Sequence, residues 1–354
     1  MGGGQFEVLS RALWTIGGAV MWNKLICFLA MIIVLLLTCM ESKTVFAGRV
    51  DSSFKVEIHN PSKAYEGTTV FGDNHDLDSP RIVELNMNGE IIWEYAIPWH
   101  LRSYTNPGFD VEVLPSNNVL FVLPGNGIYE IDRQGKIVWS HLDQKVSHDA
   151  DRLPNGNTIY VFGNGDKKKD AQVKEVNSDG KIVWSWYANE EFNKPPYEEK
   201  NSQGWTHTNA VTRMGNGNTL ISPRNFNCLV EVDSKGKVVR IIGEDYLDHQ
   251  HDPEVLTNGN ILVANHQQPH EILEIEPQTE KIVWRHPIPK RGAWPVRDAD
   301  QLPNGNILIT GTTVLIEITP KKDVVWLLKL KNVNFRSRRE KPARGFYKAQ
   351  RIGQ

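Results

Sequence analysis

LPNGNTIYVFGNGDKKKDAQVKEVNSDGKIVWSW, residues 153–186, is the stretch of sequence that decides the fold. Together with the residues just before it, this stretch predicts short β-strands at Ala150–Leu153, Thr158–Phe162, Val173–Asn177 and Lys181–Trp186. Two turns separate strands, at PNGN and at SDG, where glycine can adopt the positive φ that tight turns require. The pattern is typical of one antiparallel sheet of consecutive strands.

The two ends of this stretch recur along the chain. LPNGN returns at residues 302–306, with variants at 114–118, 214–218 and 256–260. The closing phrase GKIVW at 180–184 has counterparts at 89–93, 135–139, 236–240, 281–284 and 324–326. The spacing is about 45 residues, the period of a four-stranded propeller blade, and one blade cannot bury both of its faces alone. We therefore expect an all-β, six-bladed β-propeller with no helices beyond the N-terminal segment.

The first blade, which starts near Gly67, has a closing phrase but no inner strand of its own. Residues 346–352, FYKAQRI, align with residues 297–302, RDADQL, the inner strand of the sixth repeat. We expect this C-terminal strand to complete the first blade and close the ring, because closure would cover an exposed strand edge. The propeller would then span residues 67–354, after an N-terminal linker at 48–66.

Composition is that of a globular protein. The 354 residues contain 40 Lys and Arg against 42 Asp and Glu, a net charge of −2, and 40% of them are hydrophobic. These values exclude disorder, a collagen-like fibre and nucleic-acid binding through bulk positive charge. Of the three cysteines only Cys228 lies outside the apolar N-terminal run, so no disulfide framework or cysteine zinc site is expected there.

Residues 1–47 are predicted to be a signal peptide with an upstream extension. Lys24 precedes the apolar run Leu25–Met40, and Val45-Phe46-Ala47 offers a cleavage site before Gly48. Met21 could start a complete signal peptide by itself. The protein is thus expected to be exported, to the periplasm or the extracellular space. An uncleaved segment that anchors it to the membrane is the alternative.

The repeat register also predicts a site. Counting back five residues from the apolar residue that ends each inner strand gives equivalent positions in all blades: Phe109, His148, Asn209, His251, Arg297 and Tyr347. His207 faces the same side as Asn209 by strand alternation. The far ends of the second strands return to the same mouth of the channel, with Pro124, Gly163, Arg224, His266 and Thr312. Polar side chains should therefore converge on one opening. The basic stretch from Lys329 to Lys348 is expected either to attract an anion towards this mouth or to cross the surface.

Several chemistries are disfavoured because the chain has no phosphate-binding GxxxxGK[ST] loop, dinucleotide-binding GxGxxG turn, HExxH or GxSxG. An opening rich in histidine, with few carboxylates beyond Asp149 and Asp252, suits a histidine nucleophile that attacks an anionic group. It also suits a metal-dependent hydrolase with His148, His207 and His251 as ligands, although the charge of Arg224 beside a metal argues against this. A non-enzymatic propeller that binds an anionic glycan or peptide is the third alternative.

Four ordered segments carry a family resemblance. His148-Asp149, Trp205-Thr-His207-Thr-Asn209, Ile221-Ser-Pro-Arg224 and Gln250-His251 resemble the signature of the bacterial arylsulfate sulfotransferases, which are six-bladed periplasmic propellers. The resemblance implies that His251 is the nucleophile that becomes transiently sulfated. It also implies that His148, His207, Asn209 and Arg224 surround the sulfuryl group. The well-known members have an N-terminal β domain and a disulfide. Residues 48–66 are too few to form that domain, and Cys228, the one cysteine expected in the mature chain, cannot form the disulfide.

The residues are chemically suited to that reaction. A neutral imidazole can accept a sulfuryl group from an aryl sulfate with no cofactor. Arg224, His207 and Asn209 could stabilise the transferring oxygens, and His148 and Tyr347 could move protons to and from the phenols. Thr312 and His266 complete the expected substrate-binding set. The expected partners are an aryl sulfate donor and a phenolic acceptor, with no nucleic acid.

Overall fold

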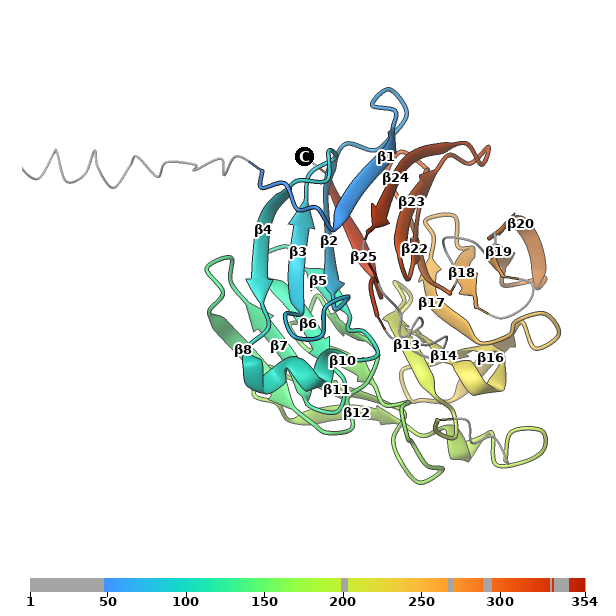
Figure 1. Cartoon of the computed structure of the whole chain (residues 1–354). Coiled ribbons are helices and arrows are strands. Elements are labelled where there is room, and N and C mark those ends of the chain that lie inside the picture. The colour runs from blue at the N-terminus through green and yellow to red at the C-terminus, as the bar shows by residue number, and fades with distance from the viewer. Residues whose placement is uncertain are drawn as a thin grey trace, which may run out of the picture. The chain divides into compact units, whose positions relative to one another are not determined.

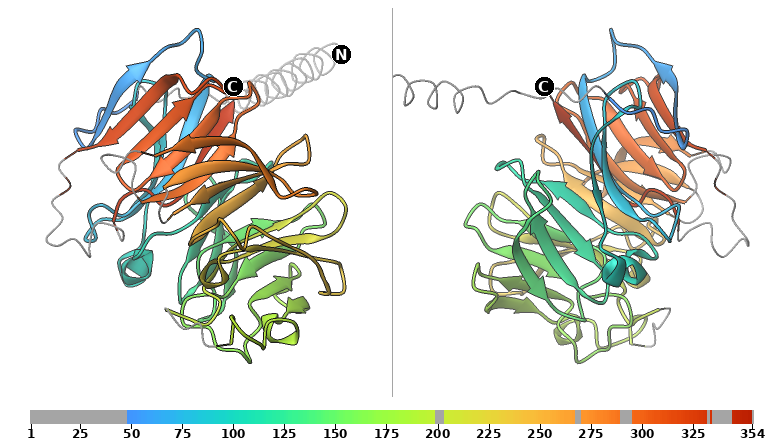
Figure 2. Two further views of the ribbon diagram at one scale, coloured as in Figure 1. Left: turned by 90° about the vertical axis from the view of Figure 1, so that its right-hand side faces the viewer. Right: turned by 60° about the vertical axis from the view of Figure 1, so that its left-hand side comes forward.

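Six antiparallel sheets arranged around a common axis make up the described structure. The computed structural model describes residues 48–198, 203–266, 270–288, 295–331, 333 and 344–353. The predicted signal peptide, residues 1–47, lies outside the described residues. Figure 2 shows from two more directions that the sheets face one another around the axis. The predicted all-β, six-bladed propeller is confirmed.

Each blade follows the strand order that the repeat predicts. The first blade is β25 (Ala349–Gly353), β2 (Gly67–Asp73), β3 (Arg81–Leu85) and β4 (Ile91–Ala96). The second is β5 (Val111–Val113), β6 (Val119–Leu123), β7 (Gly127–Ile131) and β8 (Ile137–Leu142), and the third is β9 (Ala150–Arg152), β10 (Thr158–Val161), β11 (Val173–Val176) and β12 (Ile182–Trp186). The fourth is β13 (Thr208–Arg213), β14 (Thr219–Pro223), β15 (Leu229–Val232) and β16 (Val238–Ile242), and the fifth is β17 (Gln250–Val255), β18 (Ile261–Asn265), β19 (Glu271–Glu276) and β20 (Lys281–Pro287). The sixth is β21 (Val296–Gln301), β22 (Ile307–Gly311), β23 (Val314–Ile318) and β24 (Val324–Leu330), with β1 (Phe54–His59) added outside β24.

The structure explains both repeated phrases. The last Asn of each LPNGN phrase donates its side-chain amide to a Glu on the third strand of its blade, as Asn157 does to Glu175 at 2.6 Å. The same bond forms at Asn118–Glu130, Asn218–Glu231, Asn260–Glu274 and Asn306–Glu317. The Trp of the closing phrase reaches the next blade, where Trp139 Nε1 donates to the Ser178 carbonyl at 2.9 Å. One phrase therefore stabilises a blade, and the other joins it to its neighbour.

The C-terminal strand closes the ring as predicted, although it begins at Ala349 rather than at Phe346. β25 pairs antiparallel with β2, so that Ala349 lies opposite Phe71 and Gly353 opposite Gly67. Phe346, just before the strand, contacts Phe71 with ring centroids 4.8 Å apart. The Arg351 guanidinium pairs with Glu317 of the sixth blade at 3.1 Å, and both side chains are completely buried. The seam between the last and first blades is therefore covered.

Two expectations need correction. Residues 48–66, predicted to be a linker, contain β1, whose pairing with β24 gives the sixth blade a fifth strand. This pairing covers the hydrogen-bonding edge of β24 and buries Phe54, and Figure 1 shows the two strands side by side. The described residues also form short 3-10 helices at Trp99–Thr105 (η1), Ala188–Glu190 (η2) and Arg224–Phe226 (η3), where loops between or within blades turn tightly.

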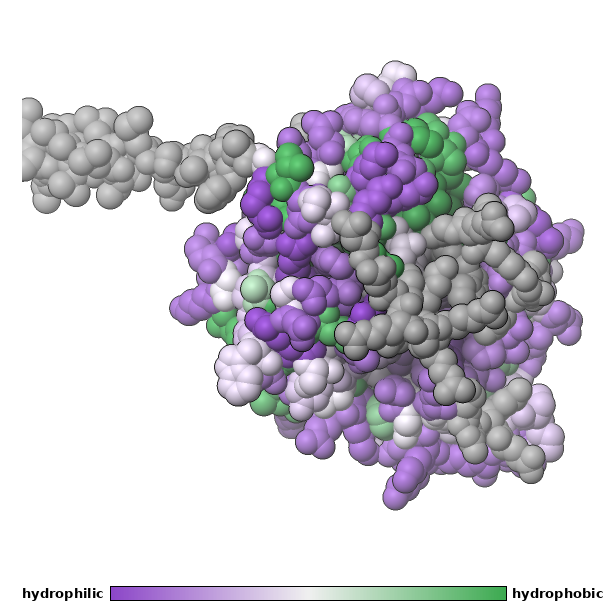
Figure 3. Space-filling view, viewed as in Figure 1, coloured by the Kyte–Doolittle hydropathy of each residue, from purple (hydrophilic) through white to green (hydrophobic). Residues whose placement is uncertain are grey.

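The hydrophobic core consists of clusters packed within and between blades. The largest joins the first and sixth blades and contains Phe71, Val83, Leu315 and Trp326. On the face drawn in Figure 3 the visible described surface is mostly hydrophilic, with hydrophobic residues in small separate patches. None of the helices in the described ranges is both long and apolar enough to span a membrane.

Candidate active site

The six equivalent positions predicted from the register lie at or next to the beginnings of the inner strands. Asn209, His251 and Arg297 are the second residues of β13, β17 and β21, and Phe109, His148 and Tyr347 stand two residues before their strands. All six are buried. A buried position is expected for the apolar Phe109, but five polar side chains at the others require partners or a ligand.

His148 lies in contact with two other predicted site residues. Its ring centroid is 4.7 Å from that of His207 and 6.2 Å from that of Tyr347. The guanidinium carbon of Arg297 lies 4.8 Å from the centroid of the Tyr347 ring. Side chains from four blades thus meet at this mouth of the channel.

His251 stacks on His266, with ring centroids 4.8 Å apart and an interplanar angle of 23°. Its Nδ1 lies 2.9 Å from the backbone carbonyl oxygen of His249. A carbonyl oxygen can only accept, so the ring nitrogen must donate its hydrogen. In the neutral ring the lone pair is therefore on Nε2, the nitrogen that would act as the nucleophile.

His207 is held by the loop that precedes β13. Its Nδ1 donates to the Gln203 carbonyl at 3.0 Å, and its φ of +47° is uncommon for a residue with a side chain. The buried carboxylate of Asp166 accepts the backbone N–H groups of Thr206 and His207. This contact stabilises a backbone conformation of the kind that clusters at functional sites.

Arg224 and Arg297 give the site a positive potential. Arg224 is the first residue of η3, and its Nη2 donates to Gln203 Oε1 at 3.4 Å. Burial lowers the pKa of Arg224 to about 10, so its guanidinium stays charged at neutral pH. Arg297 is buried too, and burial lowers its pKa.

The four histidines of the mouth are neutral. Burial and then Arg224 lower the pKa of His207 to about 3, while burial and then Arg297 lower that of His266 to about 3. Burial, followed by the neighbouring histidine and the two arginines, holds the pKa of His148 and that of His251 well below the usual imidazole value. The same two guanidinium groups act on all four rings, so these six side chains share one electrostatic environment suited to an anion.

Some buried polar atoms of the described residues have no hydrogen-bond partner, and among them are two atoms of predicted site residues at this mouth. These two atoms are His148 Nδ1 and Asn209 Oδ1. The Asn209 amide nitrogen donates one of its two hydrogens to the Gln250 carbonyl at 2.8 Å, while Oδ1 accepts none. Asn209 Oδ1 is thus able to accept a hydroxyl hydrogen, in addition to the donation to sulfuryl oxygens expected from the sequence. Unsatisfied buried polar atoms are rare in folded proteins, so these two atoms mark a place where a polar ligand could bind.

Thr312 is not brought into hydrogen-bond contact with the histidines. Its hydroxyl donates to the Pro295 carbonyl at 3.4 Å, and its own carbonyl accepts from Phe346 N–H at 2.9 Å. These bonds hold the segment that leads to Tyr347. The described contacts therefore give Thr312 a structural place at the closing seam.

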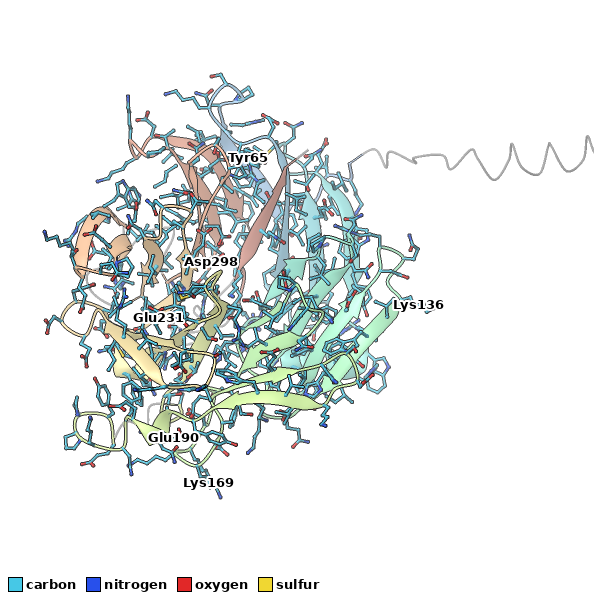
Figure 4. All side chains as sticks on the ribbon, turned by 180° about the vertical axis from the view of Figure 1, so that it is seen from behind. Tyr65, Lys136, Lys169, Glu190, Glu231 and Asp298 are labelled. Atoms are coloured by element: carbon cyan, nitrogen blue, oxygen red, sulfur yellow. The ribbon has the colours of Figure 1, made fainter. Side chains whose placement is uncertain are left out.

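Register counting missed the next position on the inner strands. In four blades this position is an aspartate, namely Asp110, Asp149, Asp252 or Asp298, and in the first blade it is Lys348. The expectation of few carboxylates beyond Asp149 and Asp252 is therefore wrong. Asp298 lies near the middle of the ring of blades in Figure 4. A cavity of about 390 Å³ is lined by these residues, except Asp149, and by Glu112, Asp151, Glu254 and Asp300 from two residues further along. Lys348 thus points into the channel rather than across the surface.

The three-histidine metal centre, one of the alternatives left open by the sequence, does not fit this arrangement. His148 pairs with His207, while His251 pairs with His266. Within the described ranges, no three His, Cys, Asp or Glu side chains are grouped closely enough to hold a metal ion.

Sequence comparison finds a known family for the segment that carries the first part of this site. The Arylsulfotransferase (ASST) family model matches residues 110–247. This confirms the resemblance to arylsulfotransferases for a segment that contains His148, His207, Asn209 and Arg224. His251, His266, Arg297 and Tyr347 follow the matched segment. No curated protein matches the chain.

Solved structures share the fold at low identity. A Bacteroides caccae protein of unknown function is 18% identical with a TM-score of 0.57, over 75% of this chain and 94% of that one. A streptogramin B lyase is 15% identical with a TM-score of 0.52, over 80% and 90% of the two chains. An inactive virginiamycin B lyase from Staphylococcus aureus, solved with quinupristin, is 14% identical with a TM-score of 0.51, over 77% and 87%. At such identities the likeness concerns the propeller alone.

Proposed function

We propose that this protein is an exported sulfotransferase that moves a sulfuryl group from an aryl sulfate to a phenol through a sulfohistidine at His251. The observation that carries the proposal is the state of His251. Its ring is buried and neutral, its Nδ1 is tied to the His249 carbonyl, and its Nε2 holds the lone pair. The similarity of residues 110–247 to arylsulfotransferases supports the same reaction class.

In the first step His251 Nε2 attacks sulfur, the N–S bond forms, and the bond from sulfur to the aryl oxygen breaks. The electron pair leaves on the phenolate. The sulfated ring becomes cationic, and the hydrogen bond from Nδ1 to the His249 carbonyl then strengthens because its donor is charged. Arg224 and Arg297 stabilise the sulfuryl oxygens and the developing phenolate.

In the second step the acceptor oxygen attacks sulfur and the N–S bond breaks, which restores neutral His251. The acceptor must lose its hydroxyl proton, and the donor's phenolate must gain one. His148 can move this proton, since its ring is neutral and its Nδ1 is unpartnered in the protein. Asn209 Oδ1 can accept the hydrogen of the incoming hydroxyl and so orient it.

The test is a burst experiment. Purified protein mixed with 4-nitrophenyl sulfate and no acceptor should release one equivalent of phenol and gain the mass of a sulfuryl group on the peptide that contains His251. Substitution His251→Ala should abolish both signals, and His148→Ala should slow them. Substitution His286→Ala, in outer strand β20, is the control and should leave them unchanged.

An adduct on a different residue, or a burst that survives His251→Ala, would refute the assignment. Binding of the aryl sulfate without phenol release would favour the anion-binding propeller instead. The chain would then recognise an anion at the same mouth without chemistry.

A further inference from the structure

Lys348 makes the densest set of ion pairs near the candidate site. Its Nζ lies 2.6 Å from Asp149 Oδ1, 2.9 Å from Asp252 Oδ1 and 3.6 Å from Asp110 Oδ1. The lysine side chain is only 13% exposed. An ammonium group has three hydrogens, which matches a setting among three carboxylates.

These carboxylates come from different blades. Asp110 precedes β5, Asp149 precedes β9, and Asp252 lies in β17, while Lys348 stands directly before the closing strand β25. One side chain from the first blade therefore contacts the second, third and fifth blades across the channel. The third and fifth blades are not neighbours of the first, so strand pairing does not join them to it.

Two of the three carboxylates directly follow candidate catalytic histidines in the sequence. Asp149 follows His148, Asp252 follows His251, and Lys348 itself follows Tyr347. Asp149 also accepts the Val211 backbone N–H at 2.6 Å, two residues after Asn209. Displacement of an aspartate would move the backbone that carries the preceding ring.

We propose that Lys348 is a positioning residue that sets the relative places of His148 and His251 through Asp149 and Asp252. This inference rests on the proposed sulfotransferase function, since it assigns both histidines to one reaction. Its physical basis is charge compensation: without the ammonium group, buried carboxylates at close range repel one another or take up protons. Either response loosens the contacts that fix the two aspartates.

A geometric shift should affect the reaction more than donor binding. A displacement of about 1 Å at a reacting group can cost roughly a hundredfold in rate, because attack requires aligned atoms. Arg224 and Arg297 supply the charge that attracts the anion, whereas the Lys348 ammonium group is bound to the three carboxylates. The affinity for the aryl sulfate donor should therefore change little when the Lys348 ammonium group is removed.

The experiment compares Lys348→Met with Lys348→Arg and with the control Lys174→Met. Lys174 is a matched residue that lies away from the mouth. Its side chain is 14% exposed, and its Nζ lies 2.7 Å from a carboxylate oxygen of Asp143. We expect Lys348→Met to lower kcat at least tenfold with donor KM changed less than threefold, Lys348→Arg to recover at least half of the lost activity, and Lys174→Met to retain kcat. A folded Lys348→Met protein with kcat within twofold of the wild type would overturn the proposal.

Two further measurements keep the test decisive. If Lys348→Met does not fold, Asp252→Asn removes one partner and leaves the Asp149 pair, and it should lower kcat severalfold without changing the melting temperature; unchanged kcat would refute the proposal. NMR of the imidazole nitrogens in protein labelled with ¹⁵N-histidine can be measured without any enzymatic activity. In folded Lys348→Met the signals of His148 and His251 should shift, while that of His286 should not. If the wild type releases no phenol, the proposed function fails, and the NMR shifts still decide whether Lys348 positions these rings.

Discussion

Substitution Glu254→Gln is expected to make the protein more stable at pH 8 but not at pH 4. Glu254 lies in β17 at the acidic cavity, and its Oε2 accepts the Gln301 backbone N–H at 2.7 Å. Glutamine keeps an oxygen for that bond and removes only the charge. The variant therefore isolates the free energy of ionising this carboxyl group.

The size of the effect follows from the pKa of Glu254. Burial, with repulsion from Asp252, raises it from 4.5 to about 7. A pKa raised in the folded state means that the native protein binds this proton more tightly than the unfolded chain does. The resulting contribution to the free energy of unfolding is fully present below about pH 4.5 and is lost as the pH rises through 7. A shift of roughly 2.5 units at about 1.36 kcal/mol per unit gives about 3 kcal/mol. The variant should gain this amount relative to the wild type between pH 4 and pH 8.

The assay is urea unfolding of both proteins at several pH values, with Glu190→Gln as control. Glu190 is an exposed residue of η2, and Figure 4 shows that it lies at the periphery, away from Asp298. The control should show no pH-dependent gain. A constant difference in unfolding free energy between Glu254→Gln and wild type from pH 4 to pH 8 would refute the reasoning about burial in the channel.

Three more outcomes are expected. Deletion of residues 346–354 should lower the melting temperature by about 6–20 °C, since it leaves Glu317 buried without Arg351, a loss of about 3–5 kcal/mol, at roughly 2–4 °C per kcal/mol. An unchanged melting temperature would contradict the closure. Arg224→Lys should reduce kcat/KM about tenfold or more, about 1.4 kcal/mol, because a lysine cannot bind sulfuryl oxygens with a planar fork, and wild-type turnover in a folded variant would exclude the clamp. The burst rate should stay constant as pH falls through 6.5, because the pKa of His251 is held well below that value by burial, and stopped-flow measurement showing a loss near pH 6.5 would place its pKa in the ordinary range.

Much of the fold could be predicted from the sequence because the repeat is local. LPNGN and GKIVW mark turns and strands whose hydrogen bonds lie within one blade or reach the next one. β1 was missed because its segment matches neither phrase, and it forms a strand only because β24 offers an unpaired edge. The short helix at Arg224–Phe226 was missed for a related reason, since three residues are too few to show a helical period.

The sequence predicted which residues form the site better than it predicted what each residue can donate or accept. Register counting brought His148, Asn209 and His251 to one mouth, and the structure places all of them there. The direction of the Asn209 amide depends on the Gln250 carbonyl, and the tautomer of His251 depends on the His249 carbonyl. Backbone carbonyl positions of this kind follow from tertiary packing, and no sequence pattern carries them.

Closure of the ring and assembly of the site depend on the same short segment. Phe346 packs into the seam, Tyr347 contacts His148, Lys348 binds the aspartates beside both histidines, and β25 follows at once. Pairing of β25 with β2 fixes the register of this segment to a single residue, because a slip by one would turn Tyr347 and Lys348 to each other's positions. A protein that opens at the seam therefore loses both the ammonium group of the channel and the phenol at the mouth. The interactions that stabilise the ring are thus also those that place the reacting groups.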